Sequence, residues 1–216
     1  DKGMYGAALY RHAVAVIEAG NLTVGDIDKL VEIFGTDASW SADDAGMAAK
    51  YAKRRSNNTD GTGYFYDMKT NLLTARAAIE AGPDYDTERD EALAAFLLNW
   101  EKSNFATVIN YCNGVKVKVQ SASSPMTAEE LGSMLHSYAE GVGFTHGFKG
   151  ISNKMITDAQ IDNILELLLA EAGQTPESFR FANEPALLAN LDQIISDIQA
   201  LYGFSDAEVT GFYTSN

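Results

Sequence analysis

The sequence predicts an all-α protein, a helical bundle of about eight or nine helices, with at most one short extended segment near residues 115–119. Three observations support this fold class. Apolar residues recur at helical spacing along most of the chain. Several of these segments begin with Ser or Thr three residues before Asp, Glu or Gln, which is the pattern of a capping box. Several also end at glycine, a residue that commonly closes a helix.

Five helices are expected in the first half of the chain. The spacing and the end signals place them at residues 4–19, from Thr23 with Asp26 to Gly35, from Ser41 with Asp44 to Arg55, at residues 66–81, and from Asp86 or Thr87 to Asn113-Gly114. The fifth would be the longest, about 39 Å at the standard helical rise, and is expected to be central to the bundle. Residues 56–63 are all turn formers and predict a loop.

The second half contains the one strand-like pattern. Val and Lys alternate over residues 115–119 after a turn-like Asn-Gly pair, but no neighbouring segment has a matching pattern with which to pair. We therefore expect an extended loop or a short edge segment there. Four helical segments follow, from Thr127 with Glu130 to about Gly147, from Thr157 with Gln160 to Gly173, from Asn183 with Pro185 to Leu201, and a short turn from Ser205 with Glu208.

The length and charge of the chain limit its organisation and partners. Its 216 residues carry no evident repeat or low-complexity linker, so we expect a single domain over residues 1–216. The formal net charge is -14, which argues against nucleic acid as a partner because a phosphate backbone would be repelled. No apolar run is long enough for a transmembrane segment.

The single cysteine and the start of the chain bear on the cellular compartment. Cys112 stands in an apolar helical pattern and is predicted to be a small buried residue, and it rules out a disulfide within the chain. That is compatible with the cytosol and with a large extracytoplasmic bacterial domain. The sequence opens at Asp1 without a signal-peptide pattern, so we expect a mature or trimmed chain.

The candidate metal ligands are His136, Glu140 and Glu101. His136 and Glu140 are four residues apart on one predicted helix, so their side chains share a face and could bind one divalent metal ion. Glu101 would be the third ligand, or else His146, if the helix broke at Gly141 or Gly143. The alternative is a polar pair that fixes the register of the helix. The chain contains no His-Glu-x-x-His motif and no other standard metal-binding spacing.

Other patterns give weaker signals. The loop Ser56–Asp67 places Asn58, Asp60 and Gly61 at positions that a twelve-residue calcium loop requires, but Ser stands first and Asp last. An ordinary Asn/Asp/Gly-rich loop is the simpler interpretation. No nucleophile elbow and no phosphate-binding glycine loop is found, so the sequence predicts no catalytic residue.

The chain also carries spread-out motifs of one bacterial family. They are the opening KGMYGAALY, the Arg-Ala-Ala-Ile motif at residues 76–79, the Tyr-containing helix end in LLNWEKSNFATVINYCN, the Ala-Glu-Gly-x-Gly-Phe turn at residues 139–144, and the segments ITDAQIDNILELLL and LDQIISDIQALYGFS. In these the chain resembles the bacterial domain of unknown function 4856, and the similarity extends over most of its length.

The resemblance implies a location and a context. Members of that family are all-helical lipoproteins or secreted proteins of Gram-negative bacteria, similar to the iron-regulated imelysin group. It implies a periplasmic or cell-surface protein, with a lipid anchor upstream of Asp1 and a protein partner or small ligand at the envelope. It also implies that this chain is a trimmed C-terminal portion. The imelysin Gly-x-His-x-x-Glu signature is absent, which argues against peptidase activity and imelysin-type metal binding.

Three functions follow as hypotheses. The first is an extracytoplasmic binding or accessory protein linked to metal (iron) acquisition, which predicts an exposed pocket or apolar groove. The second is a metal-dependent hydrolase or peptidase-like enzyme that uses His136, Glu140 and Glu101. The third is a purely structural bundle that binds a partner.

Overall fold

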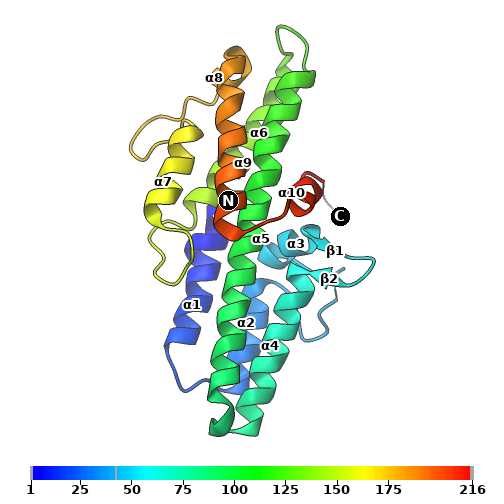
Figure 1. The fold of residues 1–216 in the computed structure, drawn as a ribbon, viewed down its shortest axis with the longest axis vertical. Coiled ribbons are helices and arrows are strands. Elements are labelled where there is room, and N and C mark those ends of the chain that lie inside the picture. The colour runs from blue at the N-terminus through cyan, green and yellow to red at the C-terminus, as the bar shows by residue number, and fades with distance from the viewer. Residues whose placement is uncertain (1, 42, 215–216) are drawn as a thin grey trace. The chain divides into compact units, whose positions relative to one another are not determined.

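The computed structural model describes residues 2–41 and 43–214. Within them the chain forms ten α-helices, three short π- or 3₁₀-helical segments and one hairpin of two-residue strands, which confirms the all-α prediction (Figure 1). The chain divides into two compact units. Among the described residues, unit 1 comprises 2–3, 105–150 and 156–214, and unit 2 comprises 4–41, 43–104 and 151–155. The single domain expected for residues 1–216 stays a prediction. No helix in the described part of the chain is both long and apolar enough to span a membrane.

Unit 2 contains the first helices and the hairpin. Its elements are the π-helix Tyr5–Tyr10, α1 (Arg11–Glu18), α2 (Val24–Phe34), α3 (Met47–Arg54), β1 (Ser56–Asn57), β2 (Thr62–Gly63), α4 (Tyr64–Ala81), the 3₁₀ turn Pro83–Tyr85 and the first part of α5 (Asp86–Ser121). The predicted loop at residues 56–63 is thus a hairpin in which Ser56 pairs with Gly63. An aromatic cluster forms the core, where the rings of Phe34 and Trp100 lie 5.1 Å apart.

The third helix begins later than the sequence predicts. α3 starts at Met47, after Gly46, so Ser41 and Asp44 do not open this helix. The preceding residues instead fold back, and Gly46 donates its backbone N–H to the carbonyl of Gly35 at 2.8 Å. This turn buries Trp40, whose ring lies 5.6 Å from that of Phe65. Burial of a large aromatic side chain outweighs the local capping signal.

Unit 1 contains the remaining helices. They are the second part of α5, α6 (Ala128–His146), α7 (Asp158–Leu167), α8 (Arg180–Asn183), the 3₁₀ turn Pro185–Leu187, α9 (Leu188–Tyr202) and α10 (Asp206–Phe212). The capping boxes at Thr127, Thr157 and Ser205 all form as predicted. Buried aromatic residues form the core, among them Phe105, whose ring lies 5.5 Å from those of Phe148 and Tyr202.

The prediction of an extended segment at residues 115–119 is wrong. α5 does not end at Asn113-Gly114 but continues to Ser121, which gives a helix of 36 residues. Val115 is buried and lies three residues after buried Cys112, so the two side chains share one helical face. The Lys118 Nζ donates to Ser137 Oγ of α6 at 2.7 Å. These tertiary contacts override the local alternation of Val and Lys.

Two helices of unit 1 are shorter than expected. α7 ends at Leu167 rather than near Gly173, because Leu169 has a positive φ of 57° and Ala170 donates its N–H back to the carbonyl of Leu165 at 2.8 Å. The helix expected from Asn183 begins only at Leu188, as α9, because Pro185 opens a 3₁₀ turn at residues 185–187. The short helix α8 precedes this turn and was not expected.

Candidate functional site

α6 brings His136 and Glu140 together, as their spacing predicts. The Nε2 atom of His136 lies 4.0 Å from Oε1 of Glu140. The side chain of His136 is 71% exposed, whereas that of Glu140 is only 12% exposed. The pair is therefore an accessible imidazole beside a largely buried carboxylate.

The Glu140 carboxylate has two further partners. The hydroxyl of Tyr111 on α5 donates to Oε2 at 2.9 Å, and Lys2 Nζ lies 3.7 Å from Oε1. Lys2 and His136 both lie near Oε1, so a metal ion bound between His136 and this oxygen would be close to the lysine cation and repelled by it. In this arrangement Glu140 links α6 to α5 and to the residues before the first helix.

Glycines on α6 allow residues 2 and 3 to approach. A Cβ atom added to Gly147 would lie 2.4 Å from the carbonyl oxygen of Gly3, and one added to Gly143 would lie 3.1 Å from Lys2 Cβ. α6 remains unbroken through Gly141 and Gly143 to His146. The helix break that would bring His146 beside His136 therefore does not occur.

Glu101 lies in unit 2, whereas His136 and Glu140 lie in unit 1. It is buried, with 1% of its surface exposed, and its carboxylate accepts the backbone N–H of Met155 at 2.8 Å. Beside it, the hydroxyl of Tyr10 donates to the carbonyl of Asn153 at 2.9 Å. Burial, and next the Glu101 charge, raise the pKa of Tyr10, so this hydroxyl stays protonated. Glu101 and Tyr10 thus hold the segment 151–155 within unit 2.

The three-ligand metal site stays a prediction. Over residues 2–41 and 43–214, no group of three or more His, Cys, Asp or Glu side chains is arranged to hold a metal ion. In the loop considered for calcium, Asp60 accepts a hydrogen bond from Asn57 Nδ2 at 2.7 Å, and the hydroxyl of Tyr66 donates to Asn58 Oδ1 at 3.3 Å. These contacts are those of a hairpin turn stabilised by its own side chains.

Cys112 is buried, as the sequence predicts. Burial raises the pKa of its thiol to about 12. At neutral pH the thiol is therefore protonated and a poor nucleophile.

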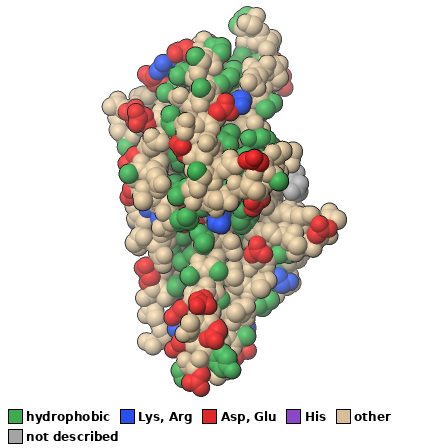
Figure 2. Space-filling model, in the orientation of Figure 1, with side chains coloured by type: hydrophobic (Ala, Val, Ile, Leu, Met, Phe, Trp, Pro, Cys, Tyr) green, Lys and Arg blue, Asp and Glu red, His purple; other side chains and the backbone are tan. Residues whose placement is uncertain are grey.

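A groove of about 540 Å³ lies in unit 1 between the end of α5, the loop that leads into α6, and α8. We call it the α8 groove. Its lining surface is polar and apolar in about equal shares, and it consists of Val119, Ala122, Ser123, Ser124, Pro125, Met126, Leu131, Phe179, Ala182, Asn183 and Pro185. In Figure 2, hydrophobic side chains reach the surface beside α8, next to charged side chains. The side chain that stands out is Phe179, which is 56% exposed.

One wall of the α8 groove is fixed by Glu130. Ser123 donates its hydroxyl and its backbone N–H to the Glu130 carboxylate at 2.6 and 3.1 Å, and Thr127 donates its own N–H at 2.8 Å. The Ser123 hydroxyl, followed by the other donors, lowers the pKa of Glu130 to about 2. The carboxylate is therefore ionised at neutral pH and holds the loop against the first turn of α6.

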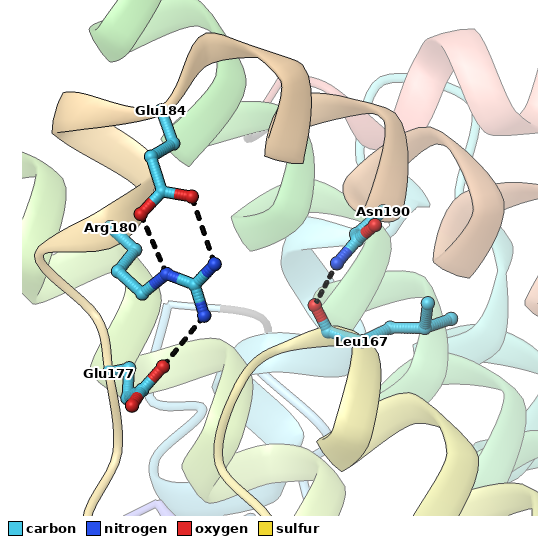
Figure 3. Close-up of polar contacts among 5 residues, drawn as sticks. All are labelled: Leu167, Glu177, Arg180, Glu184 and Asn190. Carbon is cyan, nitrogen blue, oxygen red and sulfur yellow. Dashed lines mark hydrogen bonds and ion pairs between the residues drawn. The ribbon is translucent and has the colours of Figure 1, made fainter.

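The opposite wall is formed by α8 and its flanks, which carry a local ion-pair network around Arg180. Its Nε and Nη2 donate to the two oxygens of Glu184 at 2.8 and 2.9 Å, and its Nη1 donates to Glu177 at 2.8 Å (Figure 3). The hydrogen bonds from Arg180 lower the pKa of Glu184. Nearby, Asn190 Nδ2 donates to the carbonyl of Leu167 at 3.1 Å and ties α9 to the end of α7 (Figure 3). Glu177, Arg180 and Glu184 all lie in α8 or directly beside it, so the bonds among them stabilise the helical turn itself.

Comparisons of the chain with protein-family models, with curated proteins and with solved structures found no match. The resemblance to the domain 4856 family therefore stays an expectation. Function has to be inferred from the residues described above.

The residues of the α8 groove are not among those that the sequence predicts to be functional. Phe179 and Phe181 both stand in the polar stretch that follows Gly173, and the sequence alone does not tell that Phe179 is exposed and Phe181 buried. The two groove walls come from segments far apart in the chain, around residues 119–131 and 179–185, so no local pattern predicts that they meet. Lys2 and Tyr111 were likewise not expected beside Glu140.

Proposed function

We propose that this protein is a binding or accessory protein of the bacterial envelope that holds its ligand or partner in the α8 groove. The periplasmic or cell-surface location, the lipid anchor and the link to metal acquisition rest on the resemblance to the domain 4856 family. The observation that carries the binding role is the groove itself. Its volume of about 540 Å³ falls within the range of roughly 300–1,000 Å³ that is usual for ligand pockets, and its lining combines apolar side chains with polar groups.

Phe179 is the main reason to expect that something binds there. An aromatic side chain that is 56% exposed leaves apolar area in contact with water, and covering that area would release about 25 cal/mol for each Å². Aromatic residues are also enriched in protein interfaces. The loop that forms one wall of the groove is held to α6 by charge-assisted hydrogen bonds to Glu130, so binding would not have to order it.

The experiment is binding of Nile red, a neutral apolar dye, to the full chain. We expect fluorescence enhancement with the wild-type protein and at least a tenfold weaker affinity for Phe179→Ser. Leu73→Ser is the matched control, because Leu73 of α4 is 49% exposed and lies in unit 2. Equal dye binding by wild type and Phe179→Ser would overturn the proposal.

Metal binding is the second candidate function, because His136 is exposed and stands 4.0 Å from the Glu140 carboxylate. A metal-dependent hydrolase would require at least one further ligand. The test is elemental analysis of the purified protein and calorimetric titration of Fe, Zn, Cu and Ca. Under this hypothesis one metal binds per chain and is lost in His136→Ala but retained in His12→Ala, a change at another exposed histidine. Absence of binding to the wild type would refute it.

A further inference from the structure

We propose that the partner in the α8 groove is a short amphipathic helix that carries positive charge. This inference rests on the proposed binding function and specifies its ligand. Three elements contribute apolar side chains to the groove: Val119 from α5, Leu131 from α6 and Phe179 beside α8. An amphipathic helix inserts side chains spaced three and four residues apart into a groove of this kind.

The charges around the groove favour a cationic partner. α5 ends at Ser121 on its rim, and the unpaired carbonyl groups at the end of a long helix carry partial negative charge. Glu129 is exposed on the first turn of α6, and Glu184 follows α8. The chain as a whole carries a net charge of -14. A Lys or Arg side chain on the partner would therefore be attracted to this rim, whereas an acidic partner would be repelled.

The cations nearest the groove, Lys118 and Arg180, offset this field only in part, because the four carboxylates of Glu129, Glu130, Glu177 and Glu184 outnumber them. Lys118 Nζ donates to the carbonyl of Ser133 at 2.9 Å and to Ser137 Oγ at 2.7 Å. The guanidinium of Arg180 is neutralised by Glu177 and Glu184. The positive end of α6 is likewise capped, since Glu130 closes its capping box with Thr127.

The smaller hollow beside the groove extends the same surface. It has a volume of about 260 Å³ and shares Ala122 with the groove, and Lys118, Ser121, Glu129, Glu130 and Ser133 also line it. The two carboxylates outnumber the one lysine there, so a helix whose apolar side chains occupy the groove could place a basic side chain beside them. The apolar side chains of the partner helix would thus occupy the groove, and its basic side chain would occupy the adjoining hollow.

The test uses the full chain and two synthetic peptides of about 15 residues, a length at which a helix can form on binding. One peptide has Leu at helical spacing and Lys elsewhere, and the other has Glu in place of every Lys. Affinity is measured by fluorescence anisotropy at two salt concentrations. We expect the Lys peptide to bind at least tenfold more tightly than the Glu peptide, with weaker binding at the higher salt concentration.

Three variants locate the binding. Phe179→Ser and Glu129→Lys should each weaken binding of the Lys peptide by at least tenfold, whereas Glu32→Lys, an exposed position in unit 2, should not. Equal affinity for the two peptides, or equal effects of Glu129→Lys and Glu32→Lys, would overturn the inference. So would dimerisation of the wild-type chain, by sedimentation velocity, that Phe179→Ser abolishes, since the groove would then bind a second copy.

The dye experiment separates the two proposals. Dye binding that depends on Phe179, together with no preference for the Lys peptide, would refute the cationic helix and leave the groove as a binding site. If dye binding does not depend on Phe179 and the Lys peptide is not preferred, both the binding role of the groove and the cationic helix are refuted.

Discussion

Replacing Gly114 by alanine is expected to stabilise the protein. Gly114 lies inside α5, where glycine costs about 0.5–1 kcal/mol relative to alanine. An added Cβ atom would lie 3.4 Å from Ser137 Oγ and 3.7 Å from Ser137 Cβ, which is ordinary van der Waals contact. The helical gain should therefore be realised almost in full, as about 0.5–1 kcal/mol in the free energy of unfolding.

The measurement is urea unfolding followed by circular dichroism, with thermal melting as a second readout. For a chain of this size a gain of about 1 kcal/mol corresponds to a rise in Tm of roughly 2–4 °C. Gly132→Ala is the matched control within α6, because no atom lies within 4 Å of its added Cβ. Gly82→Ala is the opposite control, because Gly82 has a φ of 102° and an alanine there would be strained.

The result that would refute this reasoning is a loss of stability in Gly114→Ala that matches the loss in Gly82→Ala. That outcome would mean that Gly114 needs a positive φ, as in the Asn-Gly turn that the sequence suggests. Residues 115–119 would then not continue α5, and the wall of the α8 groove that Val119 contributes would not exist.

Three further predictions concern Glu130, Glu101 and Cys112. The folded-state pKa of Glu130 is about 2, whereas its ordinary value is 4.5. The stabilising contribution of this carboxylate is therefore complete above pH 4.5 and is lost as the pH falls towards 2. In thermal melts from about pH 6 to pH 2, Tm should fall less steeply for Glu130→Gln than for wild type. Glu101→Leu removes the acceptor of the Met155 N–H and should lower the free energy of unfolding in urea by about 1–3 kcal/mol. Glu101→Gln should restore part of that loss. A fully stable Glu101→Leu would contradict the role of Glu101 in holding residues 151–155. Cys112 should react with Ellman's reagent only in denaturant, and fast labelling of the native protein would show that the thiol is accessible.

The elements that could be predicted from the sequence are those with local causes. The capping boxes at Thr127, Thr157 and Ser205 need only two residues three positions apart, and each begins a helix where it was expected. The continuation of α5 could not be predicted in this way. It depends on Lys118 reaching Ser137 of another helix and on the burial of Val115, and neither contact is visible in the local alternation.

The candidate site likewise combines contacts that local sequence predicts with contacts that it does not. The approach of His136 to Glu140 follows from helical geometry alone and was predicted. Lys2 approaches the same carboxylate from a position 138 residues earlier in the chain, and no sequence pattern indicates it. The α8 groove likewise joins residues near 120 to residues near 180, so its discovery required the tertiary structure.

The close approach of residues 2 and 3 to α6 predicts a sequence pattern that distant relatives should share. The side chain of any other amino acid at position 147 would collide with the Gly3 backbone, and at position 143 it would press on Lys2. Sequences that share this arrangement should therefore combine a Lys-Gly pair with a Gly-x-x-x-Gly spacing some 140 residues later, and substitutions at these positions should occur together. A search for that long-range combination would identify relatives by the backbone contact that they must preserve.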